Sequence, residues 1–221
     1  MKKLLIWIWD LLFPPKCVLC GSLLEKEETD LCHTCRIEAP VCAKSRKTLP
    51  FVAQWTVLWY YKDMVRESLL RFKFHNTQSY ALAYGRFLAM KITQELPDFD
   101  ILTWVPISPQ RKRQRGYDQV CLIVEVIGQE LGKRPVRILR KIRNNPPQSG
   151  ISGAAQRRAN VLGAYRVLSP EMIKGKRILL VDDIITTGAT ISEASRVLLT
   201  AGAQEIYCAA VAAAGEQPKK Q

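Results

Sequence analysis

Two adjacent carboxylates, Asp182 and Asp183, follow the apolar run 178–181. The run predicts a buried parallel strand, and open α/β sheets bind their ligands at the carboxyl ends of such strands. Carboxylates accept hydrogen bonds from hydroxyl groups, so this pair suits a ligand that carries hydroxyls, such as a sugar. These two residues are the candidate catalytic groups of the chain.

The residues after the carboxylates form a short loop of small and hydroxyl-bearing side chains that leads into a predicted helix. Their hydroxyls and closely spaced backbone N–H groups suit a phosphate. The stretch 190–193, Thr-Ile-Ser-Glu, has the pattern of a capping box, and the amino end of a helix attracts an anion. The residues expected to bind a sugar phosphate are Ile184, Ile185, Thr186, Thr187, Gly188, Ala189 and Thr190.

The stretch 176–190, KRILLVDDIITTGAT, resembles the signature with which type I phosphoribosyltransferases bind phosphoribosyl pyrophosphate (PRPP). The resemblance implies that Asp182 and Asp183 bind the ribose 2′- and 3′-hydroxyls, that the loop wraps the 5′-phosphate, and that Mg²⁺ accompanies PRPP. Two alternatives stay open: a structural strand with a solvated acidic end, and a metal-binding carboxylate of a nucleotide hydrolase. The second should be accompanied by a G-x-x-x-x-G-K-[ST] loop, which the sequence lacks.

The charge of the chain is strongly positive. The 221 residues carry a formal net charge of +13, and residues 101–160 contain 12 Lys or Arg against 3 Asp or Glu. Such an excess predicts a polyanionic partner, either nucleic acid or a phosphate-rich substrate. For any single basic residue, a position that faces solvent is the simpler interpretation. The 48% apolar and 24% charged composition is that of one globular domain with a small appendage.

Four of the seven cysteines form two Cys-x-x-Cys pairs, with Cys17 and Cys20 in the first and Cys32 and Cys35 in the second. Two such knuckles can place four thiolates around one structural Zn²⁺. Disulfides or a redox-active cysteine pair are the rival interpretations. A segment this short buries too small a core to fold without a cross-link or a bound metal. His33 exceeds the four ligands that zinc requires. Cys42 is expected to be the remnant of a further pair, because Ser45 replaces its partner.

A predicted strand at 101–106 is followed by a loop and the basic run RKRQRGYDQ. Guanidinium groups bind phosphate oxygens in a bidentate manner, so Ser108, Arg113 and Arg115 are expected to hold a pyrophosphate. A basic patch that faces nucleic acid or solvent is the alternative.

The polar stretch 140–160 contains Arg157 and Arg158 and is long for a connection in a compact domain. Such length is typical of a functional lid or a disordered segment. In type I phosphoribosyltransferases a mobile loop in this place closes over pyrophosphate, and the two arginines are expected to act there.

The other segments predict alternating helices and strands. Residues 51–63 predict a strand pair, and Lys73 and His75 lie near the end of a predicted helix, where a solvated position is expected rather than a catalytic one. Further predicted elements are helices Tyr80–Glu95, 119–131 and 191–202, strands 136–139, 161–167 and 205–214, and a turn at 169–175.

The opening segment, MKKLLIWIWDLLFPP, imitates a secretory signal. Asp10 interrupts its apolar stretch and no cleavage site of small residues follows, so an amphipathic helix packed on the protein is expected. Membrane contact through Trp7 and Trp9 is the alternative. With no run long enough to span a bilayer, a cytoplasmic location is expected.

Together the motifs resemble the ComF (competence protein F)/GntX family: the cysteine pairs after LLFPP, YKD, LLRFKF, RGYDQ, QSGIS and VDDIITTGAT. The resemblance implies an α/β fold with a type I phosphoribosyltransferase-like parallel sheet, flanking helices and a small amino-terminal zinc ribbon. The expected division is a helix and ribbon at 1–49, the phosphoribosyltransferase-like domain at 50–215, and a loose tail at 216–221.

The ComF resemblance implies a protein of DNA uptake in natural transformation with a PRPP-binding pocket. Its implied partners are single-stranded DNA, the competence helicase and the recombination-loading protein. The alternative is an active phosphoribosyltransferase that displaces pyrophosphate from PRPP onto an acceptor that the sequence does not identify.

Overall fold

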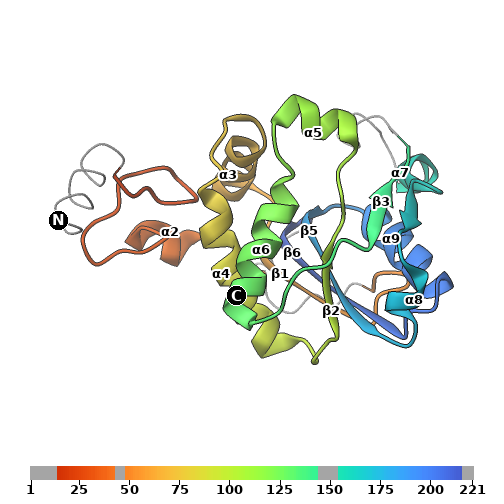
Figure 1. Ribbon diagram of the computed structural model, residues 1–221. Coiled ribbons are helices and arrows are strands. Elements are labelled where there is room, and N and C mark those ends of the chain that lie inside the picture. Colours follow the sequence, from red (N-terminus) through yellow and green to blue (C-terminus); the bar gives the residue numbers. More distant parts are fainter. Residues whose placement is uncertain (1–13, 43–47, 144–153, 216–221) are drawn as a thin grey trace.

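The protein was analysed as a computed structural model, which describes residues 14–42, 48–143 and 154–215 (Figure 1). Of Ala154, Ala155, Arg157 and Arg158 only the backbone is described. The amphipathic helix expected at the start of the chain, Ser45, residues 144–153 of the predicted lid and the tail therefore lie outside the described residues.

Four parallel strands form the central sheet, in the order β1-β6-β5-β2. They are β1 (Gln54–Tyr60), β6 (Glu205–Ala213), β5 (Arg177–Ile185) and β2 (Ile101–Trp104). All three pairings are parallel, as the apolar composition of the strands predicts for a sheet that is covered on both faces. The predicted α/β fold is confirmed.

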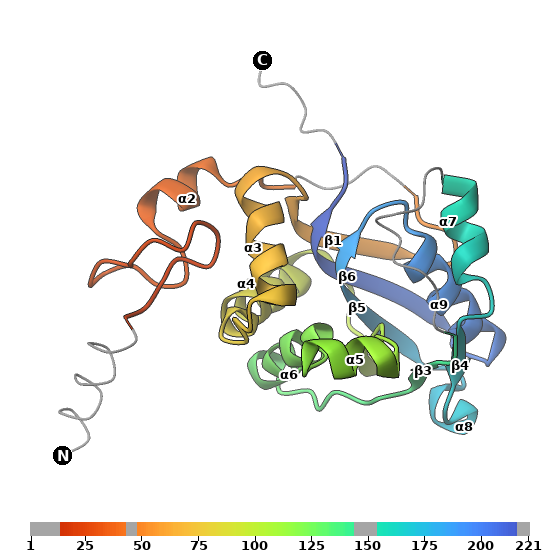
Figure 2. The ribbon, with the colours of Figure 1, turned by 90° about the horizontal axis from the view of Figure 1, so that it is seen from above.

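Helices cover both faces of the sheet. Helices α3 (Asp63–Phe74), α4 (Tyr80–Glu95) and α6 (Gln119–Leu131) lie on one side in Figure 2, and α9 (Ala189–Thr200) lies on the other. Alternate residues of β5 enter the two resulting cores, because successive side chains of a strand point to opposite faces.

A small antiparallel pair completes the α9 side. It consists of β3 (Leu139–Lys141) and β4 (Tyr165–Val167), with the short helices α7 (Ala154–Val161) and α8 (Pro170–Ile173) beside it. The turn predicted at 169–175 is thus partly helical, since Pro170 occupies the first turn of α8.

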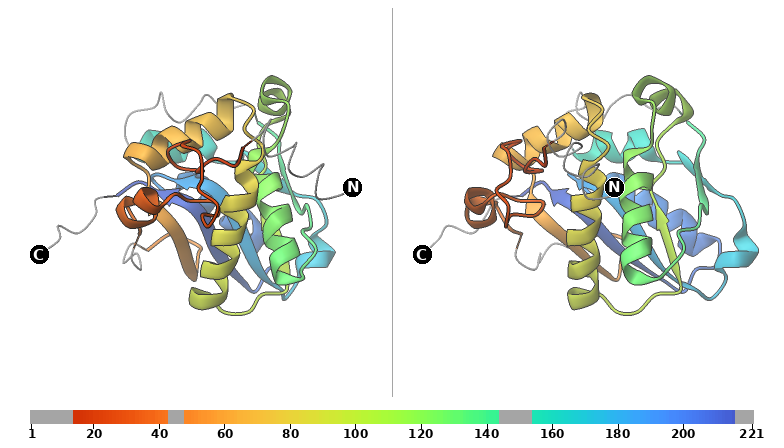
Figure 3. Two further views of the ribbon diagram at one scale, coloured as in Figure 1. Left: turned by 90° about the vertical axis from the view of Figure 1, so that its left-hand side faces the viewer. Right: turned by 60° about the vertical axis from the view of Figure 1, so that its left-hand side comes forward.

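The cysteine-rich segment packs beside α3 and α4, as both views of Figure 3 show. It contains an antiparallel bridge between Lys16 and Leu23 and the helix α2 (His33–Glu38). Cys17, Val18 and Leu19 are buried in the same apolar cluster as α3 and α4. In the described part of the chain, no helix has the length and apolar character needed to cross a membrane.

Several sequence-based boundaries were wrong, including those of the strands predicted at 136–139 and 161–167, which are the shorter strands β3 and β4, with residue 161 in α7. The strand pair expected at 51–63 is the single strand β1. Among the described residues, its outer edge carries only an isolated bridge from Val41 to Trp59. The basic run after Ser108 is not a loop but the helix α5 (Pro109–Arg115), which Gly116 ends at φ 81°. Strand β5 continues past residue 181 to Ile185, because it still pairs with β6 there.

Candidate functional site

The two aspartates lie at the carboxyl edge of the sheet, where strand β2 ends before its neighbour β5 does. Strand β2 ends at Trp104, which is opposite Val181, whereas β5 and β6 continue for four further residues of β5. Asp182 and Asp183 therefore stand just beyond the end of β2, and each residue is only 8% exposed. Successive residues of a strand face opposite sides, so the two carboxylates meet different sets of neighbours.

Asp183 faces the helices α3 and α6. Its Oδ2 atom lies 2.8 Å from the Lys73 ammonium and accepts a hydrogen bond of 3.0 Å from the Gln119 amide. Burial by itself raises the pKa of Asp183, but the charge of Lys73 and the bond from Gln119 outweigh it and hold that pKa below its usual value. Asp183 is an ionised carboxylate in a poorly hydrated place.

Asp182 faces the small sheet of β3 and β4. Its Oδ1 accepts the backbone N–H of Asp183 at 2.8 Å. Burial and the neighbouring charge of Asp183 raise the pKa of Asp182 well above its usual value. Lys141 of β3 is close enough to attract it, and burial lowers the pKa of Lys141 to about 8. Lys141 also lies over the ring of Tyr165, 5.5 Å from its centroid.

The loop after β5 turns sharply into α9. Gly188 adopts φ 81°, which favours glycine, and it is the cap residue of the helix that begins with Ala189, whose N–H donates to the Thr187 hydroxyl at 3.4 Å. The free amino end of a helix carries partial positive charge and unpaired N–H groups, so the loop 186–190 is suited to an anion. Of the predicted sugar-phosphate residues, Thr186, Thr187, Gly188, Ala189 and Thr190 form this turn beside the two carboxylates, whereas Ile184 and Ile185 belong to β5 and pack against the two cores.

The capping box predicted at 190–193 is not formed. Glu193 instead accepts the backbone N–H of Gly163 at 2.8 Å and pairs with Arg196 at 2.8 Å. Because α9 begins one residue before Thr190, Glu193 is too far along the helix to reach back to its cap. Its bond to Gly163 ties α9 to the residues that lead into β4.

The residues predicted for pyrophosphate lie at two helices, α5 and α7. The buried Ser108 caps α5 by accepting the N–H of Arg111 at 3.3 Å. Arg115 lies over the Phe74 ring, 5.2 Å from its centroid, and interacts electrostatically with Asp183. Arg113 is exposed. Arg157 and Arg158 belong to α7, and their side chains lie outside the description.

The turn Tyr117 to Gln119 joins the parts of the site. The Tyr117 hydroxyl donates to the carbonyl of Phe72 at the end of α3. Asp118 caps α6, where it accepts the N–H of Cys121 at 3.3 Å. These contacts hold the end of α3 against the start of α6, which brings Lys73 and Gln119 to the same carboxylate oxygen.

Sequence reasoning missed Lys73, Gln119, Lys141 and Tyr165. Lys73 was expected to be solvated at a helix end, and this expectation was wrong. The one available signal was that Lys73 lies in LLRFKF and Gln119 lies in RGYDQ, two of the motifs that resemble the family. Nothing in the sequence indicates that these two motifs meet in space. Lys141 had no signal, because the predicted strand stopped two residues before it.

The four cysteines of the two pairs come together. The sulfur atoms of Cys17, Cys20, Cys32 and Cys35 all lie within 4.8 Å of one another, and those of Cys20 and Cys32 are 3.6 Å apart. Tetrahedral Zn²⁺ with bonds of about 2.3 Å requires sulfur separations of about 3.8 Å, so the cluster fits that metal. The seven cysteines all lie among the described residues, and none forms a disulfide.

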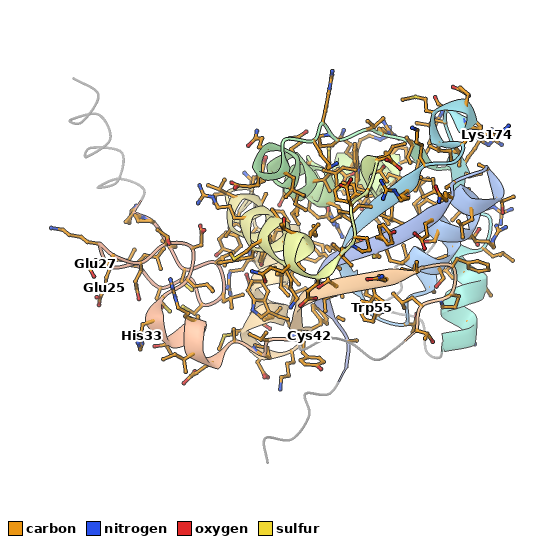
Figure 4. All side chains as sticks on the ribbon, turned by 90° about the horizontal axis from the view of Figure 1, so that it is seen from below. Glu25, Glu27, His33, Cys42, Trp55 and Lys174 are labelled. Atoms are coloured by element: carbon orange, nitrogen blue, oxygen red, sulfur yellow. The ribbon has the colours of Figure 1, made fainter. Side chains whose placement is uncertain are left out.

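His33 and Cys42 lie near the four-cysteine cluster in the sequence but are not part of it. His33 is exposed, and Figure 4 shows it in the cysteine-rich segment on the side away from the central sheet. Cys42 is buried where the ribbon meets the sheet, and its N–H donates to the carbonyl of Leu58 at 3.0 Å. His33 is thus a bystander, as expected.

Family models match at both ends of the chain. The phosphoribosyl transferase domain matches residues 121–221, and the double zinc ribbon domain matches residues 8–52. Competence protein F of Haemophilus influenzae is 26% identical and covers 86% of this chain and 93% of its own length. DNA utilization protein YhgH of Escherichia coli K12 is 24% identical, and the match covers 87% of this chain and 88% of that protein. The resemblance to the ComF family is confirmed.

Among solved structures, this chain is similar to glutamine PRPP amidotransferase from B. subtilis. The TM-score is 0.45, the identity is 19%, and the match covers 64% of this chain and 30% of that one. This likeness is too weak to support an argument about the site. The chain therefore combines a cysteine cluster within the segment that matches the double zinc ribbon domain with a segment that matches the phosphoribosyl transferase domain.

Proposed function

We propose that this ComF-type protein binds PRPP, or a related ribose 5-phosphate compound, with Mg²⁺ at the carboxyl end of β5, and that it serves DNA uptake. The observation that supports the ligand is the pair Asp182 and Asp183, both buried near the end of β5, together with the hydroxyl-bearing loop that leads from this strand into α9. Burial of two adjacent carboxylates is costly even where lysines face them, so a strand with a purely structural role would gain nothing from this pair.

The proposed division of labour follows the geometry. Asp182 and Asp183 accept hydrogen bonds from the ribose hydroxyls, while residues 186–190 surround the 5′-phosphate with backbone N–H groups and hydroxyls, and Ile184 and Ile185 of β5 support this loop from the sheet. Guanidinium groups near α5 then face the pyrophosphate, with Arg115 closest to Asp183 by its electrostatic contact. The further residues proposed for pyrophosphate are Ser108, Arg113, Arg157 and Arg158.

Mg²⁺ would enter with the ligand. Carboxylate and phosphate oxygens are the ligands this ion prefers, and it is usually held by one or two carboxylates together with substrate phosphates. Asp182 and Asp183 supply the carboxylates, and the ion when bound neutralises pyrophosphate charge.

Calorimetry with the full chain tests the ligand. PRPP should bind in the presence of Mg²⁺ and much more weakly after chelation of the ion, with ribose 5-phosphate weaker than PRPP. A parallel assay for pyrophosphate release, with a panel of nucleobases, separates a ligand-binding protein from an active transferase. Absence of PRPP binding with Mg²⁺ would reject the proposal.

A second part of the proposed function concerns DNA. Helix α5 contains four cations and no acidic residue among its seven residues, and Lys112 and Arg113 are exposed on it. Single-stranded nucleic acid binds to such surfaces through its phosphates, with an affinity that falls as salt rises. The names of the relatives, competence protein and DNA utilization protein, agree with this role.

A charge-matched comparison tests the DNA contact. K112A/R113A should weaken binding of single-stranded DNA and reduce the salt dependence. K174A/K176A removes two exposed lysines from the opposite end of the sheet, where Figure 4 labels Lys174, and should have a smaller effect. Equal losses in the two variants would mean that net charge alone attracts the DNA.

A further inference from the structure

We propose that Lys73 is a binding residue of the β5 site and that its ammonium changes partner: it neutralises Asp183 in the ligand-free protein and moves to a phosphate oxygen when the ligand takes that carboxylate. This inference rests on the proposed function, since it adds a residue to the same site.

The ion pair itself is the first observation. Lys73 and Asp183 are 2.8 Å apart, and their side chains are only 16% and 11% exposed. Removing two charges from water costs about as much as their attraction returns, so apolar residues of similar volume would often be as stable. A pair retained at this depth beside a candidate site indicates that its charges have a use beyond stability.

The second observation is that the helix carrying Lys73 is anchored independently of the ion pair. The carbonyls of Val18 and Leu19 in the ribbon accept hydrogen bonds from Ser68 and Arg71, and Tyr117 binds the carbonyl of Phe72. Lysine carries a compact charge on a flexible four-carbon stem. The ammonium can therefore change partner while the backbone of α3 stays in place.

The third observation concerns what remains at Asp183 after Lys73 leaves. Gln119 donates to the same carboxylate oxygen, so the carboxylate keeps one partner. The other atom of that amide, Oε1, is buried and has no hydrogen-bond partner among the described residues. An unpaired buried acceptor is unfavourable. A ribose hydroxyl or a water bound to Mg²⁺ is a donor that would satisfy it.

The charges of the site support the same exchange. Lys73 attracts both carboxylates, Lys141 attracts Asp182 and Arg115 attracts Asp183, so the carboxylates of the ligand-free site face several cations. Mg²⁺ at the carboxylates would displace a cation, and the incoming phosphates would need one. Lys73 can meet both requirements because it lies at the carboxylate that the ligand occupies.

K73Q tests the exchange against a matched control, K91Q. Lys91 forms a similar pair with Glu95 on α4, at 2.9 Å with side chains 18% and 28% exposed. K73Q should bind Mg²⁺ alone more tightly, because the competing cation is gone, and should bind PRPP with Mg²⁺ at least about tenfold more weakly. K91Q should change neither affinity. Unchanged or tighter PRPP binding by K73Q would overturn the proposal.

A second comparison uses D183N, in which Lys73 has no carboxylate charge to neutralise. It also keeps the proposal testable if K73Q alone fails to fold. In D183N the carboxylate charge is absent, so any effect of Lys73 on a ligand must be direct. K73Q/D183N should bind pyrophosphate with Mg²⁺ at least about tenfold more weakly than D183N does. Equal affinities would reject the phosphate contact of Lys73. An unmodified protein that binds neither PRPP nor pyrophosphate would reject the proposed function along with it.

Discussion

The two ends of the β5 strand carry the same kinds of charged residue in opposite surroundings. At the amino end, Arg177 pairs with Asp98 at 3.7 Å and with Asp100 at 3.3 Å, and the Asp98 side chain is 72% exposed. At the carboxyl end, the pair of Lys73 and Asp183 is almost enclosed.

Water accounts for the difference between the two ends. Exposed ion pairs are solvated and screened, and they contribute little to folding or to recognition. In the enclosed pair each charge depends on its protein neighbours, so a ligand that replaces one neighbour can be bound strongly. The comparison separates a solvated edge of the sheet from an edge suited to a ligand.

The largest expected effect on stability is at the enclosed pair. K73M leaves the Asp183 charge buried without its cation, and loss of one partner of a buried pair typically costs about 3–5 kcal/mol in the free energy of unfolding. R177M, which removes a cation from the exposed end, should change that free energy much less. Chemical denaturation of both variants measures the contrast, and equal losses would contradict the difference in burial.

A smaller effect of opposite sign is expected at Asp182. Its pKa is raised by burial and by Asp183, so its ionised form destabilises the folded protein at neutral pH. D182N should increase the free energy of unfolding by about 1 kcal/mol at pH 7 while it weakens ligand binding.

The pH dependence gives the control for D182N. An acid with a higher pKa in the folded state than in the unfolded state loses stability as pH rises above its unfolded pKa of about 3.9. The advantage of D182N should therefore disappear as pH falls below about 4. A D182N variant that is less stable than the unmodified protein at pH 7 would mean that the ionised carboxylate is well compensated.

The smallest expected effect is on the pH dependence of binding. The pKa of Lys141 is lowered to about 8, mainly by burial, so the lysine loses its charge as pH rises through that value. Affinity for PRPP with Mg²⁺ should fall several-fold between about pH 7.5 and pH 9. Calorimetry should show a flatter profile for K141M, whereas K133M, a substitution at the amino end of the sheet, should keep the slope of the unmodified protein.

The sequence predicted the parts of the fold that depend on local pattern. The apolar strands, the helices α4 and α6 and the paired cysteines were all expected, because periodicity and spacing are local properties. The proximity of Asp182 and Asp183 to the 186–190 loop followed for the same reason.

The partners of the carboxylates could not be predicted, because they come from distant segments. Lys73 and Asp183 are 110 positions apart in the sequence, and they meet only because Tyr117 holds the end of α3 beside α6. The capping box failed for a related reason. The tight turn at Gly188 started α9 earlier than the Thr-Ile-Ser-Glu pattern indicated.

Calorimetry of PRPP with Mg²⁺ on two charge-matched variants tests the central claim most directly. D182N/D183N and D98N/D100N each remove two negative charges, the first pair from the carboxyl end of the sheet and the second from the amino end. D182N/D183N should bind PRPP well over tenfold more weakly, because charged hydrogen bonds to the ribose are worth about 1.5–3 kcal/mol each. D98N/D100N should bind as the unmodified protein does. Unchanged or tighter binding by D182N/D183N would contradict the account, since bulk electrostatics would then govern the ligand.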